Sequence, residues 1–205
     1  MTVLHVEVLV EEPSAEAALQ ILLPKMLGDA SFAVYAHSCK DNLLKRLPER
    51  LRGYASWLPD DWRIVVVVDR DDDDCAKLKK RLEAMAAEAG LATKSKPKSK
   101  RFAVVNRLAI EELEAWYFGD WEAVLQAYPK VNANIPSQAK YRSPDEIKGG
   151  TWEAFERVMK GGGYFKTGLR KIEAARSVAE HMDPSRNSSP SFCALRDTLA
   201  AMVAA

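Results

Sequence analysis

The chain has 205 residues, of which 47% are hydrophobic and 29% charged, and its formal net charge is +1. This composition is ordinary for a soluble protein with one good-sized core, and the near-zero charge singles out no partner. The three cysteines, Cys39, Cys75 and Cys193, are widely spaced without a C-x-x-C pair, which argues against a disulfide scaffold or zinc knuckle. No apolar run approaches the roughly 18 residues of a membrane span. We therefore expect a soluble, cytoplasmic protein without a membrane partner.

The first half of the chain alternates β-rich segments with helical ones, which is typical of an α/β fold with a mainly parallel sheet. Residues 63–69, RIVVVVD, are almost unbroken apolar, as expected for a strand buried on both faces. Pro24 should kink or shorten one helix, and Pro48 should disturb another. The predicted elements are strands at 3–10, 32–38, 63–69 and 102–108 and helices at 14–27, 41–52 and 74–89.

After about residue 109 the pattern becomes helical. We expect an α/β domain over residues 1–120 and a helical extension over 121–205 that packs on it, with the alternative that the two share one core. The predicted helices of this part are 111–118, 121–128, 152–159, 168–181 and 191–203.

Acidic residues follow three of the predicted strands. In a parallel sheet the carboxyl ends of all strands meet along one edge, which is where such domains bind ligands. Repulsion within such a group is relieved most naturally by a divalent cation, and hard oxygen ligands suit Mg²⁺ or Mn²⁺. Which of the three later glutamates faces the site stays open. The acids expected at this edge are Glu11, Glu12, Asp69, Asp71, Glu111, Glu112 and Glu114.

A purely structural explanation competes with the metal site. Acidic residues favour turns and helix N-caps, and this accounts fully for Asp73 and Asp74. It accounts poorly for Asp69, because a carboxylate at the end of an apolar strand is partly desolvated. An EF-hand loop starting at Asp69 is excluded, because its sixth and twelfth positions are Asp74 and Lys80.

Two stretches, "LVEEPSAE" and "VVVDRD", resemble the Toprim domain of primases, topoisomerases and the overcoming-lysogenization-defect (OLD) nucleases. In this resemblance Glu11 is the acidic glutamate and Asp69 and Asp71 are the D-x-D pair, while Glu12 stands where a glycine is usual. The chain is more closely similar to a Toprim-like bacterial family of unknown function, related to the OLD nucleases and to RloB-like proteins. The matching pieces are "VEEPSAEAAL", "VDRDDDDC", "IEELEAWYFGD", "YFKTGLRKIEAA" and "SSPSF".

The resemblance implies a Toprim-like fold and a Mg²⁺- or Mn²⁺-dependent nuclease, or a related phosphoryl-transfer protein acting on nucleic acid. Glu11 would be catalytic, Lys166 in "YFKTG" would meet the developing charge on the substrate phosphate, and an ABC- or AAA-type ATPase would be the partner in a bacterial defence system. The implied metal ligands are Glu11, Asp69, Asp71, Glu111 and Glu114.

Two other functions stay open. One is a non-catalytic Toprim-like subunit that binds or regulates the ATPase, and a fainter one is a D-x-D glycosyltransferase. The lysine-rich loop 94–101 invites contact with nucleic acid, but the helix before it runs back about 22 Å, which places the loop at the opposite edge of the sheet. A homodimer is the default assembly.

Overall fold

A four-stranded, all-parallel sheet is the centre of the fold. The computed structural model describes residues 2–99 and 101–204, and within them the strand order is β2-β1-β3-β4. Every neighbouring pair is parallel, with Val10 opposite both Ala36 and Val67 and Asp69 opposite Ala109. The strands are β1 (His5–Val10), β2 (Ser31–Ala36), β3 (Trp62–Asp69) and β4 (Val104–Ala109).

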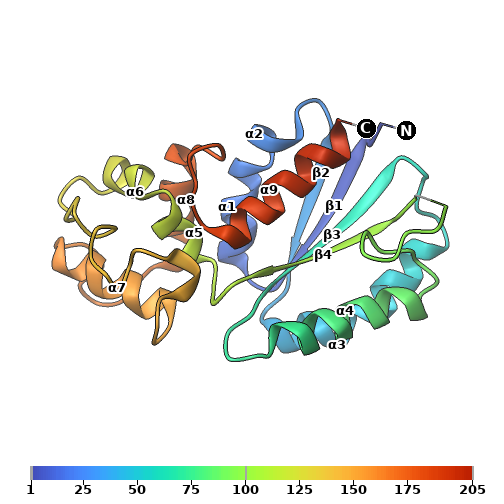
Figure 1. The fold of residues 1–205 in the computed structure, drawn as a ribbon, viewed down its shortest axis with the longest axis horizontal. Coiled ribbons are helices and arrows are strands. Elements are labelled where there is room, and N and C mark those ends of the chain that lie inside the picture. Colours follow the sequence, from blue (N-terminus) through green and yellow to red (C-terminus); the bar gives the residue numbers. More distant parts are fainter. Residues whose placement is uncertain (1, 100, 205) are drawn as a thin grey trace.

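Helices cover both faces of the sheet, and further helices lie beyond its carboxyl edge (Figure 1). Helices α3 and α4 pack on one face, whereas α1, α2 and α9 cover the other, and α8 packs against α1 and α6. Beyond the edge lie α5, α6 and α7. The helix bounds are α1 (Pro13–Leu22), α2 (Pro24–Leu27), α3 (Lys40–Ala55), α4 (Cys75–Glu88), α5 (Glu114–Gly119), α6 (Trp121–Ala127), α7 (Thr151–Gly161), α8 (Lys171–His181) and α9 (Pro190–Val203), with a 3₁₀ turn at Pro144–Glu146.

The apolar run of β3 is explained by burial on both of its faces. Val65 and Val67 belong to the cluster formed with α1, α8 and α9, whereas Val66 and Val68 belong to the cluster formed with α3 and α4. Alternate side chains of a strand point to opposite faces, so a strand between two helical layers needs apolar residues at every position. The α/β fold class predicted from the sequence is therefore confirmed.

The predicted elements are present, with shifted boundaries at a few points. Pro24 divides the predicted helix 14–27 into α1 and α2, whereas α3 continues through Pro48. The predicted helix 111–118 starts only at Glu114, because Glu111 has a φ of 60° and cannot be helical.

The helical extension and the sheet share a hydrophobic core. One cluster contains Val8 and Val65 of the sheet together with Phe155, Val178 and Leu199 of the later helices. The Lys25 ammonium also donates to backbone carbonyls at the end of α8, at 2.8–3.0 Å. The position of α8 is therefore fixed by α1 and α2.

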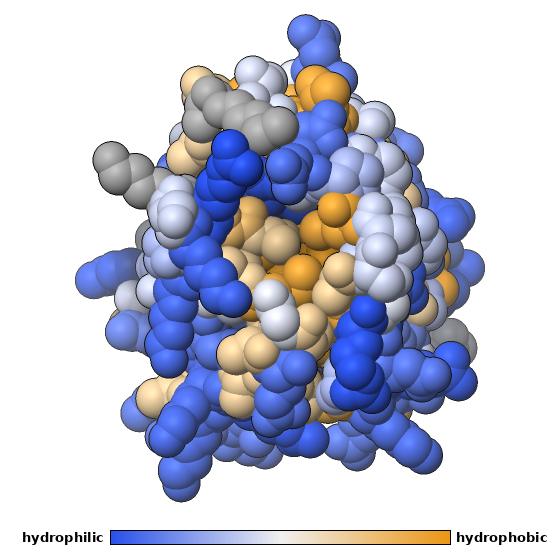
Figure 2. Space-filling model, turned by 90° about the vertical axis from the view of Figure 1, so that its right-hand side faces the viewer, coloured by the Kyte–Doolittle hydropathy of each residue, from blue (hydrophilic) through white to orange (hydrophobic). Residues whose placement is uncertain are grey.

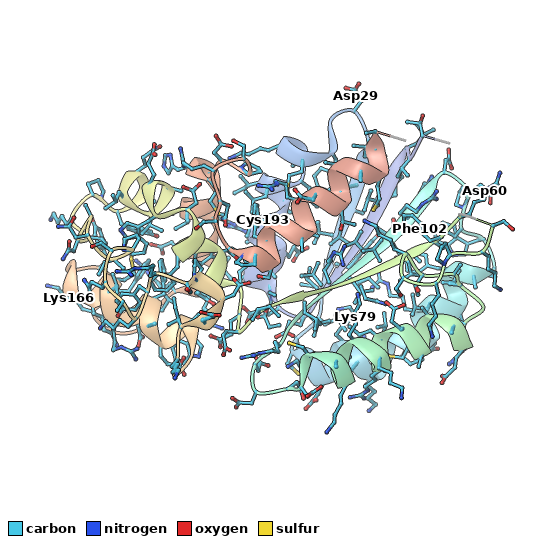
Figure 3. All side chains as sticks on the ribbon, in the orientation of Figure 1. Asp29, Asp60, Lys79, Phe102, Lys166 and Cys193 are labelled. Atoms are coloured by element: carbon cyan, nitrogen blue, oxygen red, sulfur yellow. The ribbon has the colours of Figure 1, made fainter. Side chains whose placement is uncertain are left out.

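The amino ends of the strands form the opposite end of the molecule. The lysine-rich loop begins there as predicted, because Thr93 pairs with Val104 and the Lys94 N–H donates to the Val104 carbonyl at 2.9 Å. Lys100 lies outside the described residues. Figure 2 looks onto this end and shows an apolar hollow with a hydrophilic rim. Asp60 and Phe102, which line a pocket of about 320 Å³, also lie at this end (Figure 3).

None of the helices described for this chain has the length and apolar character needed to cross a membrane.

The buried side chain of Asp120 connects the start of α6 to the segment that follows α8. The side chain of Asp120 is fully buried and accepts hydrogen bonds from Arg186 at 2.7 and 3.1 Å. It also accepts the backbone N–H of Asp183 at 2.9 Å and caps α6 through the N–H of Ala123. Its loss would remove a helix cap and leave the Arg186 guanidinium without this partner.

We expect Asp120→Ala to lower the free energy of unfolding by roughly 2–4 kcal/mol, from one lost cap and two hydrogen bonds to a charged group. Asp197→Ala removes the same charge from an exposed pair with Arg196 and should change stability by less than about 0.5 kcal/mol. Urea unfolding followed by circular dichroism measures both values. Equal effects of the two substitutions would contradict the central role of Asp120.

Candidate functional site

Glu11 and Asp69 lie side by side at the carboxyl edge of the sheet. Glu11 follows β1, and Asp69 is the last residue of β3. These neighbouring strands have crossover connections that leave in opposite directions, to β2 and to β4. Such a reversal in strand order opens a crevice in parallel sheets and is the usual ligand site of these folds. The backbone N–H of Asp69 donates to Glu11 Oε2 at 3.2 Å, so this carboxylate spans the switch point. The structure thus brings together two acids separated by 58 positions.

Both carboxyl groups are almost fully removed from water. Glu11 is 8% exposed and Asp69 is 6% exposed. Burial, and then the charge of Asp71, raises the pKa of Glu11 to about 7. Burial, and then the charges of Glu11 and Glu114, raises the pKa of Asp69 well above its usual value. A proton or a cation is therefore needed to balance this pair.

Glu114 is the member of the glutamate trio that faces the interior. It is 1% exposed at the start of α5, and its Oε2 has no hydrogen-bond partner within the described part of the chain. Burial raises the pKa of Glu114 to about 7, although the charge of Lys171 opposes this shift. An unpaired buried carboxylate oxygen is costly, and in a crevice it is suited to hold a proton or to meet a cation.

The other two glutamates of the trio are engaged elsewhere. Glu112 accepts the Thr151 hydroxyl at 3.0 Å and the Trp152 N–H at 2.8 Å, so it caps the first turn of α7. Glu111 forms an ion pair with Arg70. As a metal ligand, Glu111 would have to leave this partner.

The aspartate run after β3 is neutralised by a lysine from α3. The Lys40 ammonium lies 2.7 Å from Asp71 and 2.9 Å from Asp73, and it also donates to the carbonyl of Arg70 at 3.0 Å. Asp74 caps α4 by accepting the Lys77 N–H at 2.8 Å. The capping role predicted for Asp74 is confirmed, whereas Asp73 pairs with Lys40 because the cap position is already taken.

Backbone strain marks the two loops that carry these acids. Asp71 has a φ of 48° and Glu111 a φ of 60°, and the Asp71 N–H donates to the Glu111 carbonyl at 2.9 Å. Left-handed conformations are costly for residues other than glycine and gather at functional sites. The hydrogen bond holds the β3 and β4 loops in one arrangement at the edge of the crevice.

Lys171 is a site residue that the sequence analysis did not identify. Lys171 is the first residue of α8, and its ammonium lies 3.5 Å from Glu12 Oε2. Burial lowers the pKa of Lys171, but the charges of Glu114 and Glu12 outweigh this effect and raise it. The only sequence signal is its position in the motif "YFKTGLRKIEAA". The structure does not bring Lys166 of the same motif to the acids: it is exposed at the outer end of the helical region (Figure 3).

As the side chains stand, no three or more His, Cys, Asp or Glu residues among those described are placed to hold a metal ion jointly. A Mg²⁺ ion, however, needs fewer than three protein ligands. Mg²⁺ commonly binds through one or two carboxylates and completes its shell with water and substrate phosphate oxygens. Glu11 and Asp69 supply two desolvated carboxylates, and the unpaired oxygen of Glu114 lies within the same acidic environment.

A family model described as a domain of unknown function, DUF4276, matches residues 10–200 of the chain. No curated protein and no solved structure matches the chain. The matched region includes β3, the last residue of β1, the acids Glu11, Asp69 and Glu114, and the two lysines Lys40 and Lys171.

The raised pKa values predict that the metal-free protein loses stability as the pH rises. The unfolded chain releases the Glu11 proton near pH 4.5 and the folded chain near pH 7, so the folded state binds more protons in this window. In EDTA, Asp69→Asn should be more stable than the parent protein at pH 8, and this difference should shrink at pH 5. Thermal melts at both pH values, with the exposed Asp72→Asn as control, measure it. A destabilised Asp69→Asn protein at both pH values would mean that this carboxylate accepts structural hydrogen bonds.

Proposed function

We propose that the chain, which belongs to the DUF4276 family of domains of unknown function, is a Mg²⁺- or Mn²⁺-dependent phosphoryl-transfer protein that cleaves nucleic-acid phosphodiesters. The observation that carries the proposal is the desolvated pair of Glu11 and Asp69 at the switch point of the sheet. A site of that position and charge requires a cation or protons, and the ligand atoms are the hard oxygens that Mg²⁺ prefers.

The residues around the pair have distinct roles in this mechanism. Glu11 and Asp69 would hold the ion, which supplies charge stabilisation at the phosphate and a more acidic bound water. Glu114, with a pKa raised to about 7 by burial, can accept or release a proton at neutral pH. Lys171 supplies the positive charge that meets the charge developing on the phosphate oxygens.

Asp71 and Glu111 are weaker candidates for metal ligands, because the carboxylate of each forms an ion pair with a basic side chain. The likeness of "VEEPSAEAAL" and "VDRDDDDC" to Toprim-like proteins adds support from the sequence. On that resemblance alone we propose the cellular setting, a defence system with an ABC- or AAA-type ATPase partner, and the widely spaced cysteines favour a cytoplasmic location.

A second candidate function is a non-catalytic subunit that binds such an ATPase. The observation that favours it is charge compensation by the protein itself. Lys40 pairs with Asp71 and Asp73, and Lys171 pairs with Glu12. Combined with the lack of a ready three-ligand group among the described side chains, these pairs allow the acidic edge to be stable without metal.

The metal site is tested by thermal melting. Mg²⁺ or Mn²⁺ at a hundredfold excess over its dissociation constant should stabilise the protein by about 2.7 kcal/mol, because it binds the folded state alone. Glu11→Gln and Asp69→Asn should each abolish this gain. Asp72→Asn, in the same loop but exposed, should keep it. Retention of the metal response in Asp69→Asn would remove the proposed site.

The reaction is tested with single- and double-stranded DNA and RNA in Mg²⁺ and in Mn²⁺. Glu11→Gln and Asp69→Asn should eliminate cleavage, because loss of a ligand removes the ion that the reaction requires. Lys171→Ala should slow turnover about 100-fold, the usual cost of losing one charge-stabilising donor, whereas Lys166→Ala should cleave at nearly the parent rate. If the parent protein cleaves nothing, even with its ATPase partner, yet binds that partner, the second candidate function is the correct one.

A further inference from the structure

A groove of about 860 Å³ lies beside the acidic edge of the sheet. It is lined by His37 and Ser38, which follow β2, and by the flank of α3 that carries Asn42, Lys45 and Arg50. We call it the α3 groove. Its size falls within the range of about 300–1,000 Å³ that is common for ligand sites.

The α3 groove is basic although the whole chain is nearly neutral. Lys45, Arg46 and Arg50 line it, against the single acid Glu49. Lys45 and Arg46 are exposed, and Arg50 is partly buried. Arg46 and Arg50 lie four residues apart and so share one face of α3, about 6 Å apart along the axis, and Lys45 precedes Arg46 at the edge of this face. Such a row suits an extended polyanion.

One end of the α3 groove lies close to the candidate active site, because its lining residue His37 contacts the residue that precedes Glu11. The His37 N–H donates to the Val10 carbonyl at 3.0 Å, and its ring Nδ1 lies 2.9 Å from the same oxygen. Val10 directly precedes Glu11. At the start of α3, Lys40 contacts Asp71. A chain with one phosphate at Glu11 could therefore continue along α3.

An aromatic side chain stands beside the basic row. Tyr35, on the edge strand β2, is 38% exposed, which is unusual for a large hydrophobic residue of this protein. The Arg50 guanidinium lies 4.1 Å from the centre of its ring. A ring backed by a cation and open to solvent is a platform on which an unpaired base stacks.

We propose that the α3 groove binds a single nucleic-acid strand and leads it to the carboxylates at Glu11 and Asp69. Lys45 and Arg46 contact phosphates, and Tyr35 stacks on a base. A single strand is favoured over a duplex because a stacking side chain needs a base whose face is free. This inference rests on the proposed function for the fate of the strand, but binding itself requires no metal.

Binding is measured in EDTA by fluorescence anisotropy, with a labelled oligothymidine of about 12 nucleotides, within the site sizes that single-strand-binding folds cover. Lys45→Ala/Arg46→Ala should reduce the slope of log affinity against log salt by about 1.4, since each phosphate contact to a single strand contributes about 0.7. Lys80→Ala/Arg81→Ala removes the same charges from exposed positions of α4 and should leave the slope unchanged.

The stacking residue gives a second, independent measurement. Tyr35→Ala should weaken binding of the single strand about 5- to 100-fold, the usual range for loss of one base stack. Tyr35→Phe keeps the ring and should bind within about twofold of the parent protein. Neither substitution should alter the weak binding of a duplex of the same sequence. Circular dichroism melts establish that each variant is folded.

Parent-like binding by Lys45→Ala/Arg46→Ala overturns the proposal, and so does equal competition by duplex DNA or by polyglutamate. The outcome is separable from that of the proposed function. Groove-dependent binding in EDTA without cleavage in Mg²⁺ or Mn²⁺ would remove the nuclease and leave the groove in place. Cleavage at the parent rate by the groove variants would keep the nuclease and remove the groove.

Discussion

The desolvation of Asp69 is the constraint around which this end of the molecule is organised. A carboxylate at the end of a strand buried on both faces cannot keep its water shell, and its nearest neighbour, Glu11, is also acidic. Either protons or a cation must compensate for the lost hydration. Among the described residues, no basic side chain forms an ion pair with Asp69 to remove this difficulty. The compensating lysines pair instead with acids further along the two loops: Lys40 with Asp71, two residues after Asp69, and Lys171 with Glu12, one residue after Glu11.

Those compensating charges come from opposite faces of the sheet. Lys40 starts α3 beneath the sheet, and Lys171 starts α8 on the other side. The second lysine is available only because α8 packs against α1, and the α8 terminus is held by Lys25. The helical extension therefore supplies part of the charge environment of the sheet edge, so the site depends on the core that the two regions share.

The sequence was sufficient to predict what depends on local pattern and topology. The apolar run before Asp69 predicted a central buried strand, and parallel order then brought Glu11 to the same edge. The side-chain partners could not be predicted in this way. Nothing in the spacing separates Lys166 from Lys171, because which lysine reaches the acids depends on where α8 begins. Likewise, only the positive φ at Glu111 and the cap at Thr151 turn two of the three glutamates away from the interior.

Protons and a divalent cation compete for the same oxygens, and this competition links acidity to function. Below neutral pH, the raised pKa values of Glu11 and Glu114 keep these groups protonated, and a protonated carboxyl is a poor metal ligand. Above it, the unprotonated group is destabilising unless an ion is bound. Because Mg²⁺ binds through few protein carboxylates and completes its shell with phosphate oxygens, substrate and ion stabilise each other in such a crevice. If both proposals hold, a phosphate that arrives along the basic α3 groove would supply oxygen ligands in addition to those of Glu11 and Asp69.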